Sequence, residues 1–188
     1  MRVFPTSWTK TLAALGRKPN KYRRRAGAAL RKRRVGIERL EDRAMMAVFT
    51  VDSTLDNSTV GDGLTTLREA INAANAYADA DTIQFAASLT ANGQATISLS
   101  SQLNITNDLT IAGNFAEKLN INAQGNGRIF DITSIATDVA ISELTLTGGY
   151  VTGANVNGGA IRNSGNLTLD AVKLTGNHSD SVGGAIRS

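Results

Sequence analysis

The chain has 188 residues, enough for one domain with a real core or for a small domain plus a tail. It contains no Cys, which excludes disulfides, thiolate metal sites and cysteine nucleophiles. Its formal net charge of +4 averages two regions of opposite sign, because residues 1–43 hold 14 Lys and Arg against 3 Asp and Glu, whereas residues 44–188 hold 6 against 13. This division predicts a basic segment joined to an acidic domain.

The basic segment is open to three interpretations. Clustered Lys and Arg bind nucleic-acid phosphates without sequence preference; a second interpretation is a solvated tail without a role, and a third is a targeting segment. We favour targeting and expect no specific nucleic-acid partner, because nothing downstream is typical of a nucleic-acid-binding domain. No apolar run approaches the length of about 18 residues that a membrane-spanning helix needs.

Residues 36–47 add a second targeting signal. Leu40-Glu41-Asp42-Arg43 is followed by Met45-Met46, which is similar to an N-terminal element of large exported proteins of planctomycete bacteria. In that element a basic run precedes a core of the type Leu-Glu-Pro-Arg-x-Leu-Leu, so Asp42 stands in place of Pro and Met in place of Leu. The resemblance implies that residues 1–47 form a targeting segment for export. The same stretch also fits a short amphipathic helix, which is compatible with that role.

The clearest helix signal follows a predicted strand at residues 48–52 and a polar loop that ends at Gly63. Thr66 is the expected N-cap, and Glu69 three residues later completes a capping box. The helix is predicted to end between Tyr77 and Asp79. Its apolar residues recur at the spacing of one helical face and are Leu67, Ala70, Ile71, Ala74 and Ala78.

This helix and the strand after it carry another resemblance. Thr65-Thr66-Leu67-Arg68-Glu69-Ala70, followed by Asp81-Thr82-Ile83-Gln84-Phe85, looks like the Cys-Ser-Leu-Arg-Glu-Ala domain at the start of many bacterial surface β-helix proteins, with Thr65 in place of its Cys. The match spans residues 48–85 and implies that the helix covers the first coil, whose apolar cross-section and strand edges would otherwise be exposed. Arg68 and Glu69 are therefore expected to be capping and surface residues and not catalytic ones.

Short segments of alternating apolar and polar residues follow the helix. Gly residues separate many of them, and aromatic residues make up only 5% of the chain, a composition that suits a turn-rich solenoid. Strands are predicted at residues 82–85, 95–99, 103–106, 108–112, 119–123, 128–132, 138–142 and 144–147.

The C-terminal part of the chain repeats itself. Gly158-Gly159-Ala160-Ile161 recurs 25 residues later at Gly183, and the pattern that begins at Val139 recurs with an offset of 28 at Leu167. Repeats of this length are typical of stacked units, none of which can bury its apolar face alone. Antiparallel hairpins are the alternative to parallel coils. In parallel coils, the alternation predicts an inward stack formed by Ile161, Leu167, Leu169, Leu174 and Ile186.

The repeats resemble the Gly-Gly-Ala-Ile repeats of the polymorphic outer membrane proteins and related bacterial surface β-helices. The resemblance implies a right-handed, single-stranded parallel β-helix of the pectin-lyase-like type, which projects from the cell and mediates adhesion. We therefore predict an all-β fold with a disordered or helical basic segment (1–47), a capping strand and helix (48–85) and β-helix coils (86–188). Because a new repeat begins just before Ser188 and no terminal cap follows, we expect a solenoid truncated at its C-terminus.

Candidate catalytic groups are dispersed along the chain. A carbohydrate-active β-helix enzyme needs carboxylates at a workable separation, whereas Asp131, Asp138, Glu143 and Asp170 include no Asp-Asp or Asp-x-Asp pair. His178 is the only His, and the chain has no Gly-x-Ser-x-Gly nucleophile elbow. The Asp-rich residues 52–62 lack an EF-hand or nonapeptide calcium pattern. We expect no catalysis, no cofactor and no metal.

The sequence thus predicts an exported, extracellular β-helix of the cell surface or outer membrane with a structural or adhesive role. Its expected partners are surface glycans or proteins, bound by outward Asn and Thr faces, and its oligomeric state stays open. The alternatives are a carbohydrate-active enzyme and a non-functional truncated product of a larger surface protein. Independently of any family, Ile161, Leu169 and Ile186 are expected to be buried and stacked, so that Leu169→Asp unfolds the domain.

Overall fold

The computed structural model describes residues 46–113, 117–153 and 157–188. The predicted targeting residues from Leu40 to Met45 lie outside this range, and Met46, which follows them, is 69% exposed. The described elements are, in order, β1 (Val48–Val51), α1 (Leu67–Ala74), β2 (Asp81–Phe85), the 3-10 helix η1 (Ala87–Thr90), β3 (Ala95–Ser98), β4 (Leu103–Ile105), β5 (Leu109–Ala112), β6 (Leu119–Asn122), β7 (Phe130–Ile132), β8 (Asp138–Ser142), β9 (Thr145–Thr147), β10 (Tyr150–Val151), β11 (Ile161–Asn163), β12 (Asn166–Asp170), β13 (Lys173–Thr175), β14 (His178–Ser179) and β15 (Ile186–Arg187).

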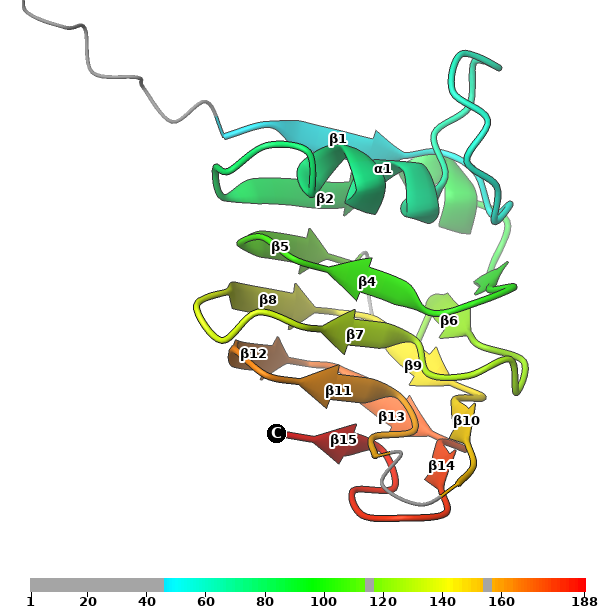
Figure 1. The fold of residues 1–188 in the computed structure, drawn as a ribbon. Coiled ribbons are helices and arrows are strands. Elements are labelled where there is room, and N and C mark those ends of the chain that lie inside the picture. Colours follow the sequence, from blue (N-terminus) through cyan, green and yellow to red (C-terminus); the bar gives the residue numbers. More distant parts are fainter. Residues whose placement is uncertain (1–45, 114–116, 154–156) are drawn as a thin grey trace, which may run out of the picture. The chain divides into compact units, whose positions relative to one another are not determined.

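The strands form three long sheets that the chain visits in turn (Figure 1). Sheet A has the strand order β1-β2-β5-β8-β12, sheet B has the order β3-β6-β9-β13, and sheet C has the order β4-β7-β11-β15. The short strands β10 and β14 pair separately and lie, along the chain, between sheets B and C. Each coil therefore contributes one strand to every long sheet, and four coils follow one another from β2 to β15.

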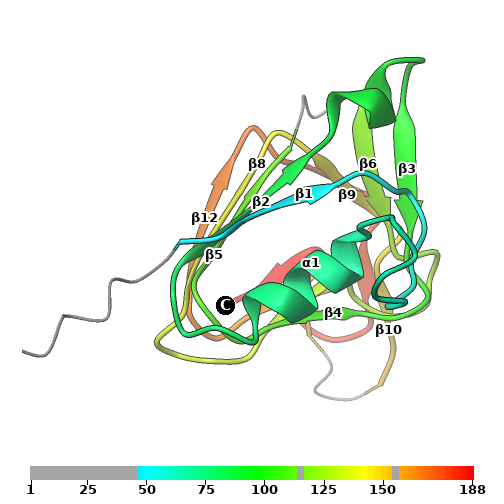
Figure 2. The ribbon, with the colours of Figure 1, turned by 90° about the horizontal axis from the view of Figure 1, so that it is seen from above.

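The coils wind as a right-handed helix. Seen from the β1 end of the stack, the chain passes clockwise through β2, β3 and β4 while it moves away from the viewer (Figure 2). Every strand pair among the described residues is parallel. The predicted right-handed parallel β-helix is confirmed, and the antiparallel-hairpin alternative is wrong.

Inward side chains stack from coil to coil in register. The repeat offsets of 28 and 25 residues equal the separation in sequence between paired residues of neighbouring strands, because Val139 pairs with Leu167 and Ile161 pairs with Ile186. The column on sheet A consists of Ile83, Ile111, Ile141 and Leu169. The column on sheet C consists of Leu103, Phe130, Ile161 and Ile186. Removing these apolar surfaces from water is the main force that holds one coil on the next.

Burial of the predicted repeat core is incomplete. Ile161 is fully buried, but Leu167, Leu169, Leu174 and Ile186 are half-buried and pack against the core from one side. All four belong to the fourth coil, and no further coil lies beyond it within the described residues. Leu169 and Ile186 are therefore stacked in register as expected, but the expectation that they are buried is wrong, because each is only half-buried. A charge at Leu169 would reach water more easily than a charge at the equivalent residue Ile141, which is fully buried. Leu169→Asp should therefore lower the free energy of unfolding by less than the complete unfolding predicted above requires.

Helix α1 lies across the interior at the other end of the stack (Figures 1 and 2). It contacts β1, β2 and β4, and its buried face is formed by Leu67, Ala70, Ile71 and Ala74. The helix ends at Ala74 and not near Tyr77; Asn75 is its C-cap, and the Asn75 side chain binds the first coil. The Asn75 side-chain nitrogen donates to the Asn104 carbonyl (2.8 Å), and its side-chain oxygen accepts from the Thr106 amide (3.0 Å).

The two Gly-Gly-Ala-Ile segments lie side by side in successive coils. The Gly159 amide donates to the Gly184 carbonyl at 2.9 Å. Gly158 and Gly183 have φ of +72° and +71°, and a Cβ on either would lie 2.2 Å from the backbone oxygen of the Ile three residues later. The first glycine of the motif is therefore required by the turn in both coils.

The second glycine is required only where another coil packs against it. A Cβ on Gly159 would lie 2.4 Å from the backbone oxygens of Gly184 and His178, whereas a Cβ on Gly184 would meet nothing within 4 Å. We expect Gly159→Ala to lower the free energy of unfolding by about 2 kcal/mol or more, and Gly184→Ala to change it by less than about 0.5 kcal/mol. Urea unfolding followed by circular dichroism measures both, and equal effects would contradict the register of these coils.

Candidate functional site

Thr66 and Glu69 form a reciprocal cap at the start of α1. The Thr66 hydroxyl oxygen accepts a hydrogen bond from the Glu69 amide (3.1 Å), and the Glu69 carboxylate accepts one from the Thr66 amide (2.9 Å). The same hydroxyl donates to the Asn57 carbonyl (2.7 Å), which ties the preceding loop to the helix. Both side chains are used to begin the helix and to hold the loop against it.

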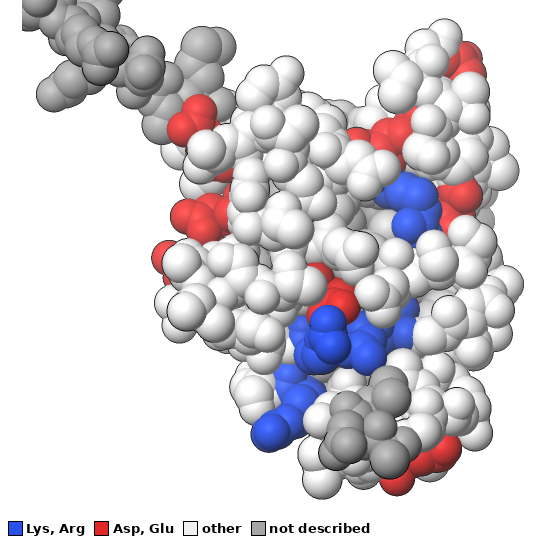
Figure 3. Space-filling model, in the orientation of Figure 1, with Lys and Arg blue, Asp and Glu red and all other residues white. Residues whose placement is uncertain are grey.

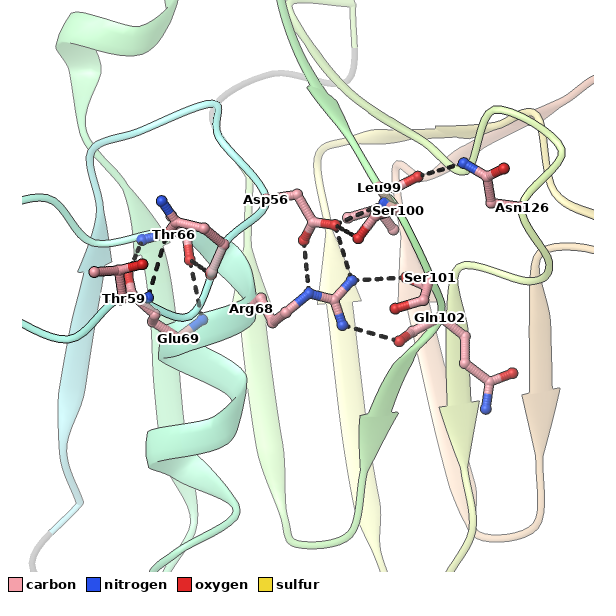
Figure 4. Close-up of polar contacts among 11 residues, drawn as sticks. Asp56, Thr59, Thr66, Arg68, Glu69, Leu99, Ser100, Ser101, Gln102 and Asn126 are labelled. Carbon is pink, nitrogen blue, oxygen red and sulfur yellow. Dashed lines mark hydrogen bonds and ion pairs between the residues drawn. The ribbon is translucent and has the colours of Figure 1, made fainter.

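Arg68 and Asp56 fasten the capping helix to the first coil (Figure 4). Arg68 donates to the two carboxylate oxygens of Asp56, at 2.8 and 3.0 Å, and to the carbonyls of Ser101 and Gln102, at 2.8 and 3.2 Å. Asp56 also accepts hydrogen bonds from the amide and hydroxyl of Ser100, at 2.6 and 2.7 Å. Because Ser100, Ser101 and Gln102 connect β3 to β4, one ion pair joins the helix, its preceding loop and the first coil.

The surroundings of Asp56 favour its ionised form. Burial by itself would raise the pKa of the Asp56 carboxyl, but hydrogen bonds from Arg68 and Ser100 outweigh burial and hold this pKa below its usual value. The side chain is only 5% exposed. Sequence reasoning did not single out Asp56, because the local pattern shows only one acidic residue among several in the loop from Asp52 to Asp62.

A groove runs along the outward face of sheet B, and we call it the polar groove. It has a volume of about 440 Å³ and is lined by hydroxyl, amide and charged side chains, among them Thr96, Asn120, Asn122, Thr145, Thr147 and Thr175. The sequence predicted outward Asn and Thr faces for binding, but it did not indicate which of the three sheets would carry a groove.

The register of sheet B sets the spacing of these groups. Thr96, Asn120, Thr145 and Lys173 form one column with one residue from each coil, and neighbouring strands lie about 4.8 Å apart. The charged residues in the lining are Glu117 and Lys173, which have opposite signs. The polar groove therefore offers a regular row of hydrogen-bond donors and acceptors without a net charge.

A compact charged cluster lies on the outward side of sheet C. Asp131 accepts hydrogen bonds from Arg162 on its two carboxylate oxygens, at 2.7 and 2.6 Å, and a further one from the Gln102 amide at 3.1 Å. Arg128 lies 4.0 Å from the same carboxylate and is 7% exposed. Burial lowers the pKa of Arg128; the charge of Asp131 opposes this change and that of Arg162 adds to it. Sequence reasoning named Asp131 only as one of four dispersed carboxylates and did not find its pairing with Arg162.

Of the remaining candidate catalytic groups, only Glu143 and Asp170 are neighbours among the described residues, and they meet through the backbone, where the Glu143 amide donates to the Asp170 carbonyl at 3.0 Å. Asp138 begins β8, Asp170 ends β12, and Glu143 lies at a corner with φ of +54°. His178 stacks on Tyr150, with ring centroids 5.2 Å apart, at the short pair of strands. Among the described residues, no group of three or more His, Asp or Glu side chains is placed to hold a metal ion.

The chain has no match among protein-family models, curated proteins or solved structures. Within the described ranges, no helix has the length and apolar character needed to cross a membrane. Function is therefore inferred from the outward faces of sheets B and C.

Asp56→Asn tests how the capping helix is held. The substitution keeps the shape of the side chain but removes the charge that Arg68 and Ser100 bind, so we expect the free energy of unfolding at neutral pH to fall by about 2–3 kcal/mol. A carboxyl with a lowered folded-state pKa stabilises the protein above its unfolded-state pKa of about 3.9, and this contribution is lost as the pH falls through the folded-state value. The difference between wild type and variant should therefore shrink below about pH 4.

Urea unfolding of both proteins at neutral and acidic pH measures this difference. Asp62→Asn is the control, because Asp62 lies in an exposed loop and accepts a local hydrogen bond from the Leu64 amide two residues later. We expect that control to change the free energy of unfolding by less than about 0.5 kcal/mol. If the difference in the free energy of unfolding between wild type and Asp56→Asn stayed constant with pH, this result would contradict the stabilising role of the Asp56 charge.

Proposed function

We propose that the chain is an exported β-helix that binds neutral glycans through the polar groove and serves an adhesive or structural role at the cell surface or outer membrane, without catalysis. The observation that carries the proposal is the lining of the groove. Each coil adds hydroxyl or amide side chains to this lining at the same outward positions, from Thr96 and Asn120 to Thr147 and Thr175.

The lining favours a sugar over a protein as the ligand. Protein interfaces have a central region enriched in aromatic and other large apolar side chains, and the lining of the polar groove includes none. Sugar hydroxyls need both donors and acceptors, and Thr hydroxyls and Asn amides supply both. Because the lining residues lie mostly on strands, few groups must be ordered when a ligand binds.

The double variant Thr96→Ala with Asn120→Ala tests the polar groove in the full chain. The two residues are neighbours in one column, and neither is fully buried. Wild type and variant are compared for binding to immobilised neutral glucan, mannan and galactan oligosaccharides. We expect the affinity for those that bind wild type to fall about tenfold or more, since two hydrogen bonds contribute about 1 kcal/mol each.

Thr110→Ala is the matched control for this experiment. Thr110 is an exposed outward residue of sheet A, away from the polar groove, so its replacement should leave glycan affinity unchanged. An equal loss in Thr110→Ala, or no binding of wild type to any neutral oligosaccharide, would contradict the proposal.

A carbohydrate-active enzyme is the second candidate, and one observation favours it. Asp131 lies beside Arg128 and Arg162 on sheet C, a grouping of carboxylate and cations that such an enzyme needs. Shortened products in the same incubations, lost in Asp131→Ala, would support this candidate. Products that persist in Asp131→Ala, Asp138→Ala and Asp170→Ala would show that these carboxylates are not catalytic.

The export part of the proposal rests on the resemblance of residues 40–46 to a targeting element. The intact mass of the native protein, measured separately in surface and cytoplasmic fractions, tests it. We expect a surface form that lacks about the first 40 to 47 residues, because targeting segments of this kind are removed from the mature protein. An unprocessed protein confined to the cytoplasm would contradict export.

A further inference from the structure

The outward column of sheet C carries a concentration of positive charge. Asn104, Asp131, Arg162 and Arg187 lie in register in successive coils, and Arg128 lies beside Asp131. Figure 3 shows Lys and Arg side chains gathered around an acidic group on this side of the molecule. We call Arg128, Arg162 and Arg187 together the arginine face.

One carboxylate does not neutralise the arginine face. Asp131 is 5% exposed and binds Arg162 through both oxygens, while Arg162 itself stays 46% exposed. Arg128 is 7% exposed, and its Nε and Nη1 atoms are buried without a hydrogen-bond partner among the described residues. Arg187 is exposed and donates to the Ser188 carbonyl at 2.9 Å. Three positive side chains thus share the single negative charge of Asp131, so an anion bound at the exposed Arg162 and Arg187 would lower the electrostatic energy of the cluster.

The arginine face is an exception on an acidic domain. Residues 46–188 contain 6 Lys and Arg against 13 Asp and Glu, and three of the six form this face. Arg68, another of the six, is already paired with Asp56. Most of the surface therefore repels an anionic ligand, and the field of the domain directs such a ligand to the arginine face.

We propose that the arginine face binds the carboxylate or sulfate groups of an acidic polysaccharide. Arg donates two parallel hydrogen bonds to such oxyanions, and Arg162 and Arg187 follow each other at one coil step of about 4.8 Å. The side-chain amides of Gln102 and Asn104 lie in the first coil, two coils before Arg162, and supply partners for sugar hydroxyls.

A single-stranded nucleic acid fits this face less well. Proteins that bind single strands stack the bases on aromatic side chains, and the outward column consists of Asn104, Asp131, Arg162 and Arg187, without an aromatic residue. The arginine face is on sheet C and the polar groove is on sheet B, so the two binding proposals can fail independently.

Binding of the full chain to four probes at about physiological salt tests the proposal. The probes are an oligouronate, a sulfated oligosaccharide, a neutral oligosaccharide and a single-stranded oligonucleotide. We expect the acidic sugars to bind wild type, to bind Arg187→Gln roughly threefold more weakly and to bind Arg162→Gln about tenfold more weakly. Binding of either acidic sugar with this pattern supports the proposal, and the tighter one identifies the oxyanion.

Matched variants separate charge recognition from folding and from the basic segment. Lys118→Gln removes an equal charge from an exposed position outside the arginine face and should leave the affinity unchanged. Asp131→Asn removes the carboxylate that competes for Arg162 and should tighten acidic-sugar binding roughly threefold, a gain that a purely structural role would not produce. Residues 1–43, with 14 Lys and Arg against 3 Asp and Glu, are present in every variant, so their contribution is common to all.

Three results would overturn the proposal. Equal binding of acidic sugars by all variants would assign the binding to residues 1–43. Weaker binding by a folded Asp131→Asn variant would show that Asp131 does not compete with the ligand. An oligonucleotide that bound more tightly than either sugar, and that Arg162→Gln and Arg187→Gln lost, would assign the face to nucleic acid.

Discussion

Each coil of this molecule depends on a neighbour to cover its apolar cross-section. Inside the stack the next coil does this in register, as Ile141 does for Ile111, and both are fully buried. At one end helix α1 takes the place of a coil, and the Arg68–Asp56 ion pair holds it there. In the fourth coil, Leu169 has a described neighbour on one side only and is half-buried. The stability of each coil therefore depends on its interfaces with the neighbouring coils, as in other solenoids.

The same stacking decides what the surface can bind. Parallel pairing holds outward side chains in columns with a step of about 4.8 Å, so the residue at one position of each coil determines the chemistry of a whole face. On sheet B these positions hold mainly Thr and Asn, with charges of opposite sign at Glu117 and Lys173. On sheet C they include Arg162 and Arg187 beside Asp131. One scaffold thus presents a neutral row of hydrogen-bonding groups and a positive row on different faces.

Much of the fold could be predicted because its signals are local or periodic. Alternation indicated the long-sheet strands, and the repeat offsets indicated which residues stack, as Ile161 and Ile186 do. The capping box at Thr66 marked the start of α1. The end of α1 at its C-cap Asn75 could not be read from the apolar stripe, because the Asn75 side chain binds residues of the first coil that are distant in the sequence. The two-residue strands β10 and β14 were missed because they are too short to show a period.

The sequence by itself determined the parallel β-helix, its coil register and its helical cap, because each of these depends on residues that are close in the chain or recur at a constant interval. Only the tertiary structure decided which polar residues meet. Asp56 reaches Arg68 across 12 residues, and Asp131 reaches Arg162 across 31. The polar groove likewise combines strands from four coils. Partners of this kind leave no local pattern, since the winding of the chain brings them together.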